Sequence, residues 1–126
     1  MILDTNAVSA LADGDPAISS LLAHADELVL PVIVLGEYRY GINQSRHRLR
    51  YQVWLAELIS VSRILDVDRF TTDSYAAIRS ELKTQGQPIP ANHLWIAALA
   101  RQHRLPLLSR DHHFDAVPGL CRLSWP

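Results

Sequence analysis

Short apolar segments alternate with longer helical patterns along the whole chain, and this alternation limits the possible folds more than any other feature. The segments expected to form strands lie at residues 1–3, 28–30, 64–67, 105–109 and 120–125. The apolar spacing between them predicts helices at residues 7–11, from 16 onward, and at 32–43, 46–62, 72–84 and 93–103. Strands separated by helices favour a mainly parallel sheet that helices cover on both faces. We therefore expect an α/β fold.

Length and composition indicate a single domain spanning residues 1–126. A chain of 126 residues with 48% hydrophobic and 20% charged residues has the composition of an ordinary folded domain. Cys121 is the only cysteine, which excludes an intrachain disulfide. The longest apolar stretch, residues 28–35, is far shorter than the ~20 residues of a membrane span. Because the first residues also lack the basic segment of a signal peptide, we expect a cytoplasmic protein without membrane contact.

Acidic residues stand where sites form in open α/β sheets, just beyond the carboxyl ends of strands. Asp4 follows the first expected strand, and Asp111 follows the fourth. The alternative role for Asp4 is to cap the helix that comes next. Glu37 lies in an otherwise apolar or aromatic stretch, and buried carboxylates are rare unless they are paired or bound to a cation. For Glu37, a salt bridge to an arginine and a metal-binding role both remain open.

Several carboxylates at one edge of a sheet would repel one another unless a cation joins them. Two unit charges 4 Å apart cost on the order of 4 kcal/mol at an effective dielectric constant of 20. Mg²⁺ or Mn²⁺ removes this cost, prefers oxygen ligands, and activates water for attack on a phosphodiester. No Cys/His quartet with zinc spacing and no glycine-rich phosphate loop occurs in the chain. His112 and His113 could bind a transition metal, but adjacent loop histidines are more typical of surface or packing positions, which is the interpretation we favour.

Five short motifs gather most of the polar residues that this chemistry needs. In chain order they are Asp4-Thr5-Asn6, Leu35-Gly36-Glu37-Tyr38, Pro88-Ile89-Pro90-Ala91-Asn92, Leu94-Trp95-Ile96-Ala97-Ala98 and Ser109-Arg110-Asp111-His112-His113-Phe114. As a set, and over the whole chain, they resemble the VapC-like PIN-domain toxins. The resemblance implies a three-layer α/β/α sandwich with a central, mainly parallel sheet. It also implies a Mg²⁺- or Mn²⁺-dependent endoribonuclease, the toxin of a type II toxin–antitoxin system, which forms a homodimer and binds a cognate VapB-like antitoxin.

The resemblance also implies roles for individual residues of this chain. Asp4, Glu37 and Asp111 match the family's acidic positions, which hold the metal directly or through water. Asp115 matches a less constant acidic position. The polar neighbours that would orient these carboxylates are Thr5, Asn6 and Ser109.

One position departs from the family pattern. The family places an Asp between Asn92, the expected N-cap of the following helix, and Leu94, whereas this chain has His93. A neutral imidazole supplies neither the negative charge nor the oxygen ligand of a carboxylate, and an imidazolium would repel the ion. The site is then weakened or shifted toward a metal that accepts nitrogen, such as Mn²⁺, or His93 is an inactivating change, or it only caps the helix. We favour the hypothesis that catalytic activity is reduced or lost.

Three functions compete at this point. The leading hypothesis is an RNA endonuclease, with the arginines at 46, 48 and 50 as candidates for contacting flanking phosphates, although a net charge of −1 does not by itself indicate a nucleic-acid binder. The second is a catalytically inactive PIN-fold module that still binds RNA and antitoxin. The third is a metabolite hydrolase or phosphatase, and against it the chain lacks a nucleophile motif such as Gly-x-Ser-x-Gly.

The helices expected at 32–43 and 46–62 carry more apolar residues than one helix pair must bury. Those that would point mostly inward from the second helix are Leu49, Val53, Ala56 and Leu58. Those that would line a groove for an amphipathic antitoxin helix, unless they are ordinary core residues, are Tyr38, Tyr40, Val53, Trp54 and Leu58.

Overall fold

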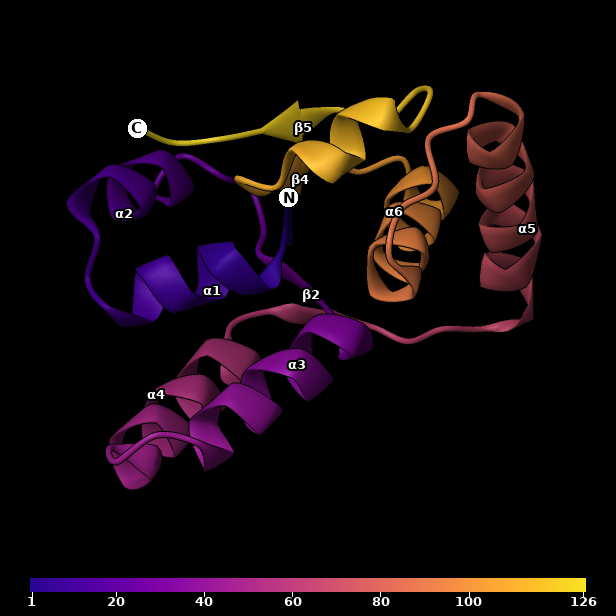
Figure 1. The fold of residues 1–126 in the computed structure, drawn as a ribbon. Coiled ribbons are helices and arrows are strands. Elements are labelled where there is room, and N and C mark those ends of the chain that lie inside the picture. The colour runs from indigo at the N-terminus through magenta and orange to yellow at the C-terminus, as the bar shows by residue number, and fades with distance from the viewer.

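A parallel five-stranded sheet lies at the centre of the molecule (Figure 1). The computed structural model describes residues 1–126. The strands are β1 (Ile2–Leu3), β2 (Val29–Pro31), β3 (Arg63–Leu65), β4 (Leu107–Leu108) and β5 (Arg122–Leu123), in the order β3-β2-β1-β4-β5. All pairs of neighbouring strands are parallel. The expectation of a mainly parallel sheet is therefore confirmed, although most strands are shorter than the apolar segments suggested.

Helices connect the strands and cover the sheet. They are α1 (Thr5–Ala12), α2 (Pro16–Leu22), α3 (Val32–Asn43), α4 (Arg48–Ser60), α5 (Arg69–Thr84) and α6 (Ala91–His103), followed by the 3₁₀ helix η1 (His112–Ala116). Helix α1 contacts α2 and α3, and α3 contacts α4. Helices α5 and α6 pack side by side (Figure 1), and α6 also contacts α3. This arrangement is the expected α/β/α sandwich.

The central strands are apolar on both faces because helices cover both. Ile2, Leu3, Leu107 and Leu108 have no exposed surface. Continuous burial of this kind is typical of parallel sheets. Helix α6 is enclosed as well, since its residues 96–100 are all buried. Each large apolar side chain buried in this way contributes roughly 1.5–3 kcal/mol to folding, so the elements that carry the site's residues stand on the best-packed part of the molecule.

Two helix boundaries differ from the sequence-based prediction for identifiable reasons. Helix α5 begins at Arg69, three residues earlier than expected, because Asp68 forms a capping box with Thr71. Asn92 is not the N-cap of α6: the helix begins at Ala91, and Pro90 is the cap residue without a side-chain bond. The carbonyl of Pro90 accepts a hydrogen bond from the Leu94 amide at 3.1 Å, so the first turn begins two residues earlier than expected.

The inward face of α4 was predicted wrongly except at Leu58. Leu49 is 79% exposed and Val53 is 63% exposed, while Leu55 and Leu58 are the buried residues. Helix α4 packs mainly on α3 at the edge of the molecule (Figure 1), so only a narrow stripe of it is covered. Three of the apolar residues predicted to point inward, Leu49, Val53 and Ala56, therefore face outward.

None of the helices is both long enough and apolar enough to cross a membrane.

Candidate active site

The polar residues predicted from the sequence meet at the carboxyl edge of the sheet. Strands β1 and β4 are neighbours, with Leu3 opposite Leu108, so the residues that follow each strand come together. Asp4 is 4% exposed and Ser109 is fully buried. The Ser109 hydroxyl donates a hydrogen bond to Asp4 Oδ2 at 2.7 Å, and the Asp4 amide donates to the carbonyl of Leu108 at 3.1 Å. The two loops are thus joined by short bonds at the site.

Asp4 also serves as the N-cap of α1, so both roles considered for it are compatible. Its Oδ1 accepts a hydrogen bond from the Thr5 amide at 2.8 Å. Its extended backbone ends β1 and begins the helix in a single residue. The cap fixes the side chain toward the carboxyl edge, and this is why a residue with an ordinary structural function can also stand in a site.

Asn6 and Ser109 together hold the loop that carries Asp111. The Ser109 hydroxyl accepts hydrogen bonds from the Asp111 amide at 3.0 Å and from the Asn6 side chain at 3.3 Å. The side-chain oxygen of Asn6, Oδ1, accepts a hydrogen bond from the Arg110 amide at 3.3 Å. The two bonds made by Asn6 cross between the segments after β1 and β4, so the position of Asp111 depends on a residue about a hundred positions away in the chain.

Glu37 reaches the same edge from α3. Thr5 donates its hydroxyl hydrogen to Glu37 Oε1 at 3.2 Å, and no arginine pairs with this carboxylate. The salt bridge considered as an alternative is therefore absent. Thr5 and Glu37 line one end of a pocket of about 220 Å³ that extends past Tyr38 to Ser45 and Tyr51. Glu37 thus faces a space that a ligand can enter.

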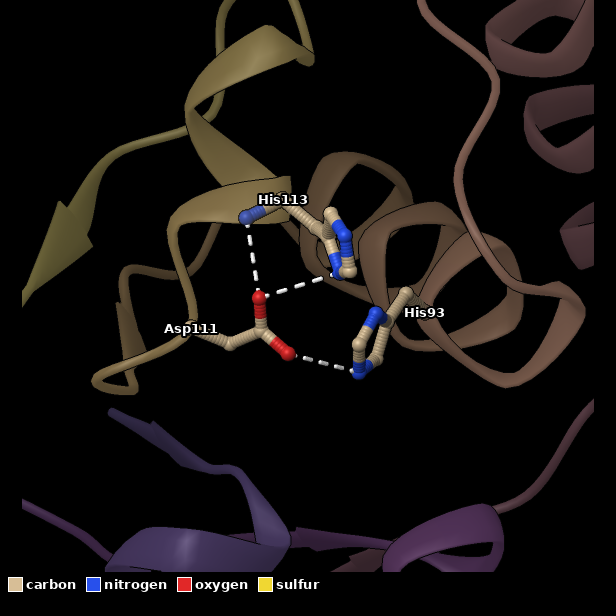
Figure 2. A group of neighbouring side chains, drawn as sticks. All are labelled: His93, Asp111 and His113. Carbon is tan, nitrogen blue, oxygen red and sulfur yellow. Dashed lines mark hydrogen bonds and ion pairs between the residues drawn. The ribbon is translucent and has the colours of Figure 1, made fainter.

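Asp111 is flanked by two histidines, as Figure 2 shows. His93 Nε2 lies 3.1 Å from Asp111 Oδ2, and His113 Nδ1 lies 3.1 Å from Asp111 Oδ1. The three side chains present ligand-type atoms within 4.8 Å of one another. His93 is mostly buried, with its ring 4.8 Å from that of Phe114, and its Nδ1 has no hydrogen-bond partner. Asp4 and Glu37 lie outside this group of three.

Asp115 is engaged by an arginine instead. The guanidinium of Arg122 donates to both oxygens of Asp115, at 2.7 and 3.0 Å, and His112 Nδ1 lies 3.1 Å from Oδ2. The hydrogen bond from Arg122 lowers the pKa of Asp115 to about 2, so it stays charged. Arg122 also donates to the carbonyl of Ser109 at 2.9 Å. The structure brings Asp115 next to this loop but not into the group around Asp111.

Two residues of this region, His113 and Arg122, were not identified from the sequence as members of the site. His112 is 83% exposed on its side chain, as a surface histidine should be, but the neighbouring His113 turns toward Asp111. The reason is that Asp111 caps η1, with its Oδ1 accepting from the His113 amide at 2.9 Å, which folds the ring back over the carboxylate. Arg122 has no distinguishing motif, and only the pairing of β5 with β4 places it here.

A parallel sheet with acidic residues at its carboxyl edge is the architecture of a PIN domain, and the family model for the PIN domain matches residues 1–120. The chain therefore belongs to the PIN-domain family, and within it to the VapC-like proteins. Ribonuclease VapC5 of Mycobacterium tuberculosis is 31% identical over 94% of this chain and 87% of its own length. Toxin FitB of Neisseria gonorrhoeae is 31% identical over 88% of this chain and 87% of its own length.

Solved structures agree with this assignment. The crystal structure of VapBC2 from Rickettsia felis, bound to a DNA fragment from its promoter, aligns with a TM-score of 0.89 and 27% identity. The alignment covers 99% of this chain and 98% of that one. FitAcB from Neisseria gonorrhoeae aligns with a TM-score of 0.84 and 28% identity over 97% and 95% of the two chains. Nucleases of the PIN family depend in general on divalent metal ions.

Proposed function

We propose that this chain is the toxin of a type II toxin–antitoxin pair, an endoribonuclease that cleaves RNA phosphodiester bonds, with activity lowered by His93. The observation that carries the proposal is the convergence of Asp4, Glu37 and Asp111 on the carboxyl edge of a PIN-domain sheet, beside a pocket. Membership of the VapC-like group supports the same reaction, because the relatives at about this level of identity are named ribonucleases.

The catalytic ion would be Mg²⁺ or Mn²⁺, held by Asp4, Glu37 and Asp111. The donor set fits these ions in kind, because it consists of carboxylate oxygens that other side chains already orient. Thr5 bonds to both Asp4 and Glu37, and Ser109 bonds to Asp4 and to the Asp111 amide, so two residues link the three carboxylates. When bound, such an ion lowers the pKa of a bound water and neutralises charge on a phosphodiester.

Asp115 would add a fourth carboxylate only after leaving Arg122. Its two oxygens are both engaged by that guanidinium. We therefore keep Asp115 as an outer acidic residue of the site. Because its charge is paired with Arg122, it repels RNA phosphates less strongly than a free carboxylate would. Its proposed contact with the ion is accordingly through water.

His93 is the reason to expect reduced activity. His93 Nε2 lies 3.1 Å from Asp111 Oδ2 and interacts with it. An aspartate at position 93 would leave that oxygen free and would contribute a carboxylate oxygen of its own. The substitution therefore takes away one ligand and engages a second. A loss of ligand orientation of this kind costs roughly 10–100-fold in metal affinity or activity.

The substrate path would run along the pocket between Glu37 and Tyr51. Helix α4 begins at this end of the molecule, and Arg46, Arg48 and Arg50 near its start are exposed. Guanidinium groups there can contact phosphates that flank the cleaved bond. Replacing these arginines by alanine should reduce the salt dependence of RNA binding, and unchanged salt dependence would remove them from the path.

The partner would be a VapB-like antitoxin, and the toxin itself would form a homodimer in the cytoplasm. Similar solved structures include VapBC-5 from Mycobacterium tuberculosis, a member of the VapBC family of toxin–antitoxin systems, and VapBC2 from Rickettsia felis. On this chain Tyr40, Leu49 and Val53 are exposed apolar residues of α3 and α4, which suits the apolar side of an amphipathic helix. Tyr38 and Leu58 belong to the core instead, and Trp54 is partly buried against Tyr38.

The alternative function is a module that binds RNA and antitoxin without cleaving, and the interaction of His93 with Asp111 is the observation that favours it. Purified protein, the His93→Asp variant and a His24→Asp control should be assayed on a mixed RNA pool with Mg²⁺ or Mn²⁺, with and without EDTA. His24 is the matched control because it is an exposed histidine that contacts none of the residues of the site.

We expect His93→Asp to cleave at least about tenfold faster than the unaltered chain, EDTA to stop cleavage, and His24→Asp to change nothing. Equal cleavage by all three proteins would show that His93 is tolerated. Absence of cleavage by His93→Asp on any RNA, with RNA binding retained, would replace the nuclease proposal with the binding module.

A further inference from the structure

The group formed by His93, Asp111 and His113 has the composition of a transition-metal site. Two imidazole nitrogens and one carboxylate are the ligands that zinc and related ions accept, whereas Mg²⁺ prefers oxygen alone. His93 comes from the first turn of α6, and the other two residues come from the start of η1 (Figure 2).

The geometry matches an ion placed between the three side chains. An ion about 2.1 Å from each of three tetrahedral ligands separates the ligand atoms by about 3.4 Å. Here the two nitrogens each lie 3.1 Å from an oxygen of Asp111, and all three ligand atoms are within 4.8 Å of one another. A small rotation of His113, which is 55% exposed on its side chain, would bring its nitrogen in.

Two features hold the ligands in place before any ion binds. Asp111 is fixed because its Oδ1 caps η1 and its amide bonds to Ser109. His93 is fixed because its ring packs against Phe114, which is fully buried. Pre-arranged side chains lower the cost of binding, since little conformational freedom is lost.

We infer that His93, Asp111 and His113 form a site for a divalent transition metal of the zinc class, with His93 Nε2, His113 Nδ1 and an Asp111 oxygen as ligands and the remaining positions left to water. Three protein ligands with open positions are the pattern of a reactive or exchangeable metal site rather than a closed structural one.

The affinity should be moderate. Metal-ligating histidines normally donate their second N–H to a carbonyl or carboxylate, and losing that partner costs about 10–100-fold in affinity. His93 Nδ1 is buried without such a partner. The site therefore exchanges its ion readily, unlike the permanent zinc sites built from four protein ligands.

Occupation of this site has a consequence for Asp111. One carboxylate cannot serve fully in two sites, so a zinc-class ion at His93 and His113 would compete with Mg²⁺ at Asp4 and Glu37. This competition rests on the proposed nuclease function, whereas binding of the transition metal does not.

The test uses the full chain without an affinity tag, titrated with Co²⁺, whose visible absorption reports nitrogen and oxygen coordination, and then with Zn²⁺ in competition. His93→Gln and His113→Gln are the test variants, and His112→Gln is the matched control. We expect one Co²⁺ per chain, displaced by Zn²⁺, with affinity at least about tenfold weaker in each test variant and unchanged in the control.

Equal Co²⁺ affinity in all four proteins, or an equal loss in His112→Gln, would overturn the site. Circular dichroism shows whether the His93→Gln variant, whose altered side chain is mostly buried, still folds. If it does not, the His113→Gln variant still tests the site, because His113 is exposed. Cleavage by His93→Asp is measured separately, so a chain that binds Co²⁺ through these residues while His93→Asp cleaves no RNA contradicts the nuclease function and leaves the metal site standing.

Discussion

At the scale of single residues, the kind of ion that the site suits depends on which side chain occupies position 93 of α6. An aspartate there adds an oxygen and a negative charge, whereas His93 adds a nitrogen that bonds to Asp111 at 3.1 Å. The change alters the kind of ion that the surrounding residues suit, from one that prefers oxygen to one that accepts nitrogen. The fold around it is unaffected, because the ring packs against Phe114 in the space between α6 and η1.

Ser109 is the residue on which the acidic edge depends most. Its hydroxyl donates to Asp4 at 2.7 Å and accepts from the Asp111 amide at 3.0 Å, and it is fully buried. Ser109→Ala in the His93→Asp background should lower Mg²⁺-dependent RNA cleavage by roughly 10–100-fold, because the Asp4 carboxylate loses an orienting hydrogen bond and the Asp111 backbone loses the bond that holds its loop. Kinetics at several Mg²⁺ concentrations measure this effect.

Ser124→Ala is the control for that substitution, since Ser124 is exposed near the chain end. It should leave cleavage unchanged. If Ser109→Ala cleaves as fast as its parent at limiting Mg²⁺, the hydroxyl does not orient the carboxylates and the site needs a different description.

At the scale of elements, the cap residue of α5 ties the start of this helix to the end of α6. Asp68 accepts hydrogen bonds from the amides of Phe70 and Thr71, and Gln102 on α6 donates to the same Asp68 oxygen at 3.1 Å. Thr71, which is fully buried, also donates to Gln102 at 2.6 Å. These bonds fix the start of α5 against the helix that carries His93.

Asp68→Ala should lower the melting temperature at pH 7 by a few degrees, because a helix cap and an inter-helix bond are lost together. The hydrogen bond from the Thr71 amide holds the pKa of Asp68 below its usual value. A lowered pKa in the folded state stabilises the protein above the unfolded pKa of about 3.9 and ceases to do so as pH falls through the folded value. The difference in melting temperature between the variant and the parent should therefore shrink as the solution is acidified below about pH 4.

Asp73→Ala provides the matched control, because it removes the same charge from an exposed position on the same helix. Its melting temperature should stay close to that of the parent at every pH. An equal decrease for both variants would mean that net charge, and not the cap, stabilises α5.

The class of the sheet and one helix could be predicted well from the sequence, whereas the buried face of α4 could not. The alternation of apolar segments with helical patterns was enough for the parallel α/β class, and the helix at 32–43 was predicted with the observed bounds. The buried face of α4 was not, because Leu49, Val53 and Ala56 satisfy a helical period although they face solvent. Periodicity identifies an apolar stripe but not which neighbour, if any, covers it.

At the scale of the whole molecule, strand order determines which loops can form the site. The sequence indicates that Asp4 and Asp111 each follow a strand, but only the adjacency of β1 and β4 brings them together. His113 and Arg122 could not be assigned from local pattern, because a cap at Asp111 turns the first inward and the pairing of β5 with β4 positions the second. Long-range pairing of this kind is absent from any short motif.

The outer surface of α3 and α4 is the other feature that only the whole molecule defines. These helices lie together at one side of the sheet, with α4 outermost (Figure 1). Leu49 and Val53 are four residues apart on α4 and therefore share one face, and both are largely exposed. An apolar face of this kind suits the antitoxin that we propose, whose amphipathic helix would cover it.

Val53→Asp should weaken binding of the antitoxin encoded beside this chain by at least about tenfold, equivalent to roughly 1.4 kcal/mol. The reason is that a charge would be buried against an apolar partner surface. The variant should fold normally, since Val53 is 63% exposed. Val61→Asp is the control, because Val61 is 72% exposed beyond the last residue of the same helix. Titration calorimetry on both variants decides the matter: selective loss with Val53→Asp places the antitoxin on α4, whereas wild-type affinity in both variants places it elsewhere on the molecule.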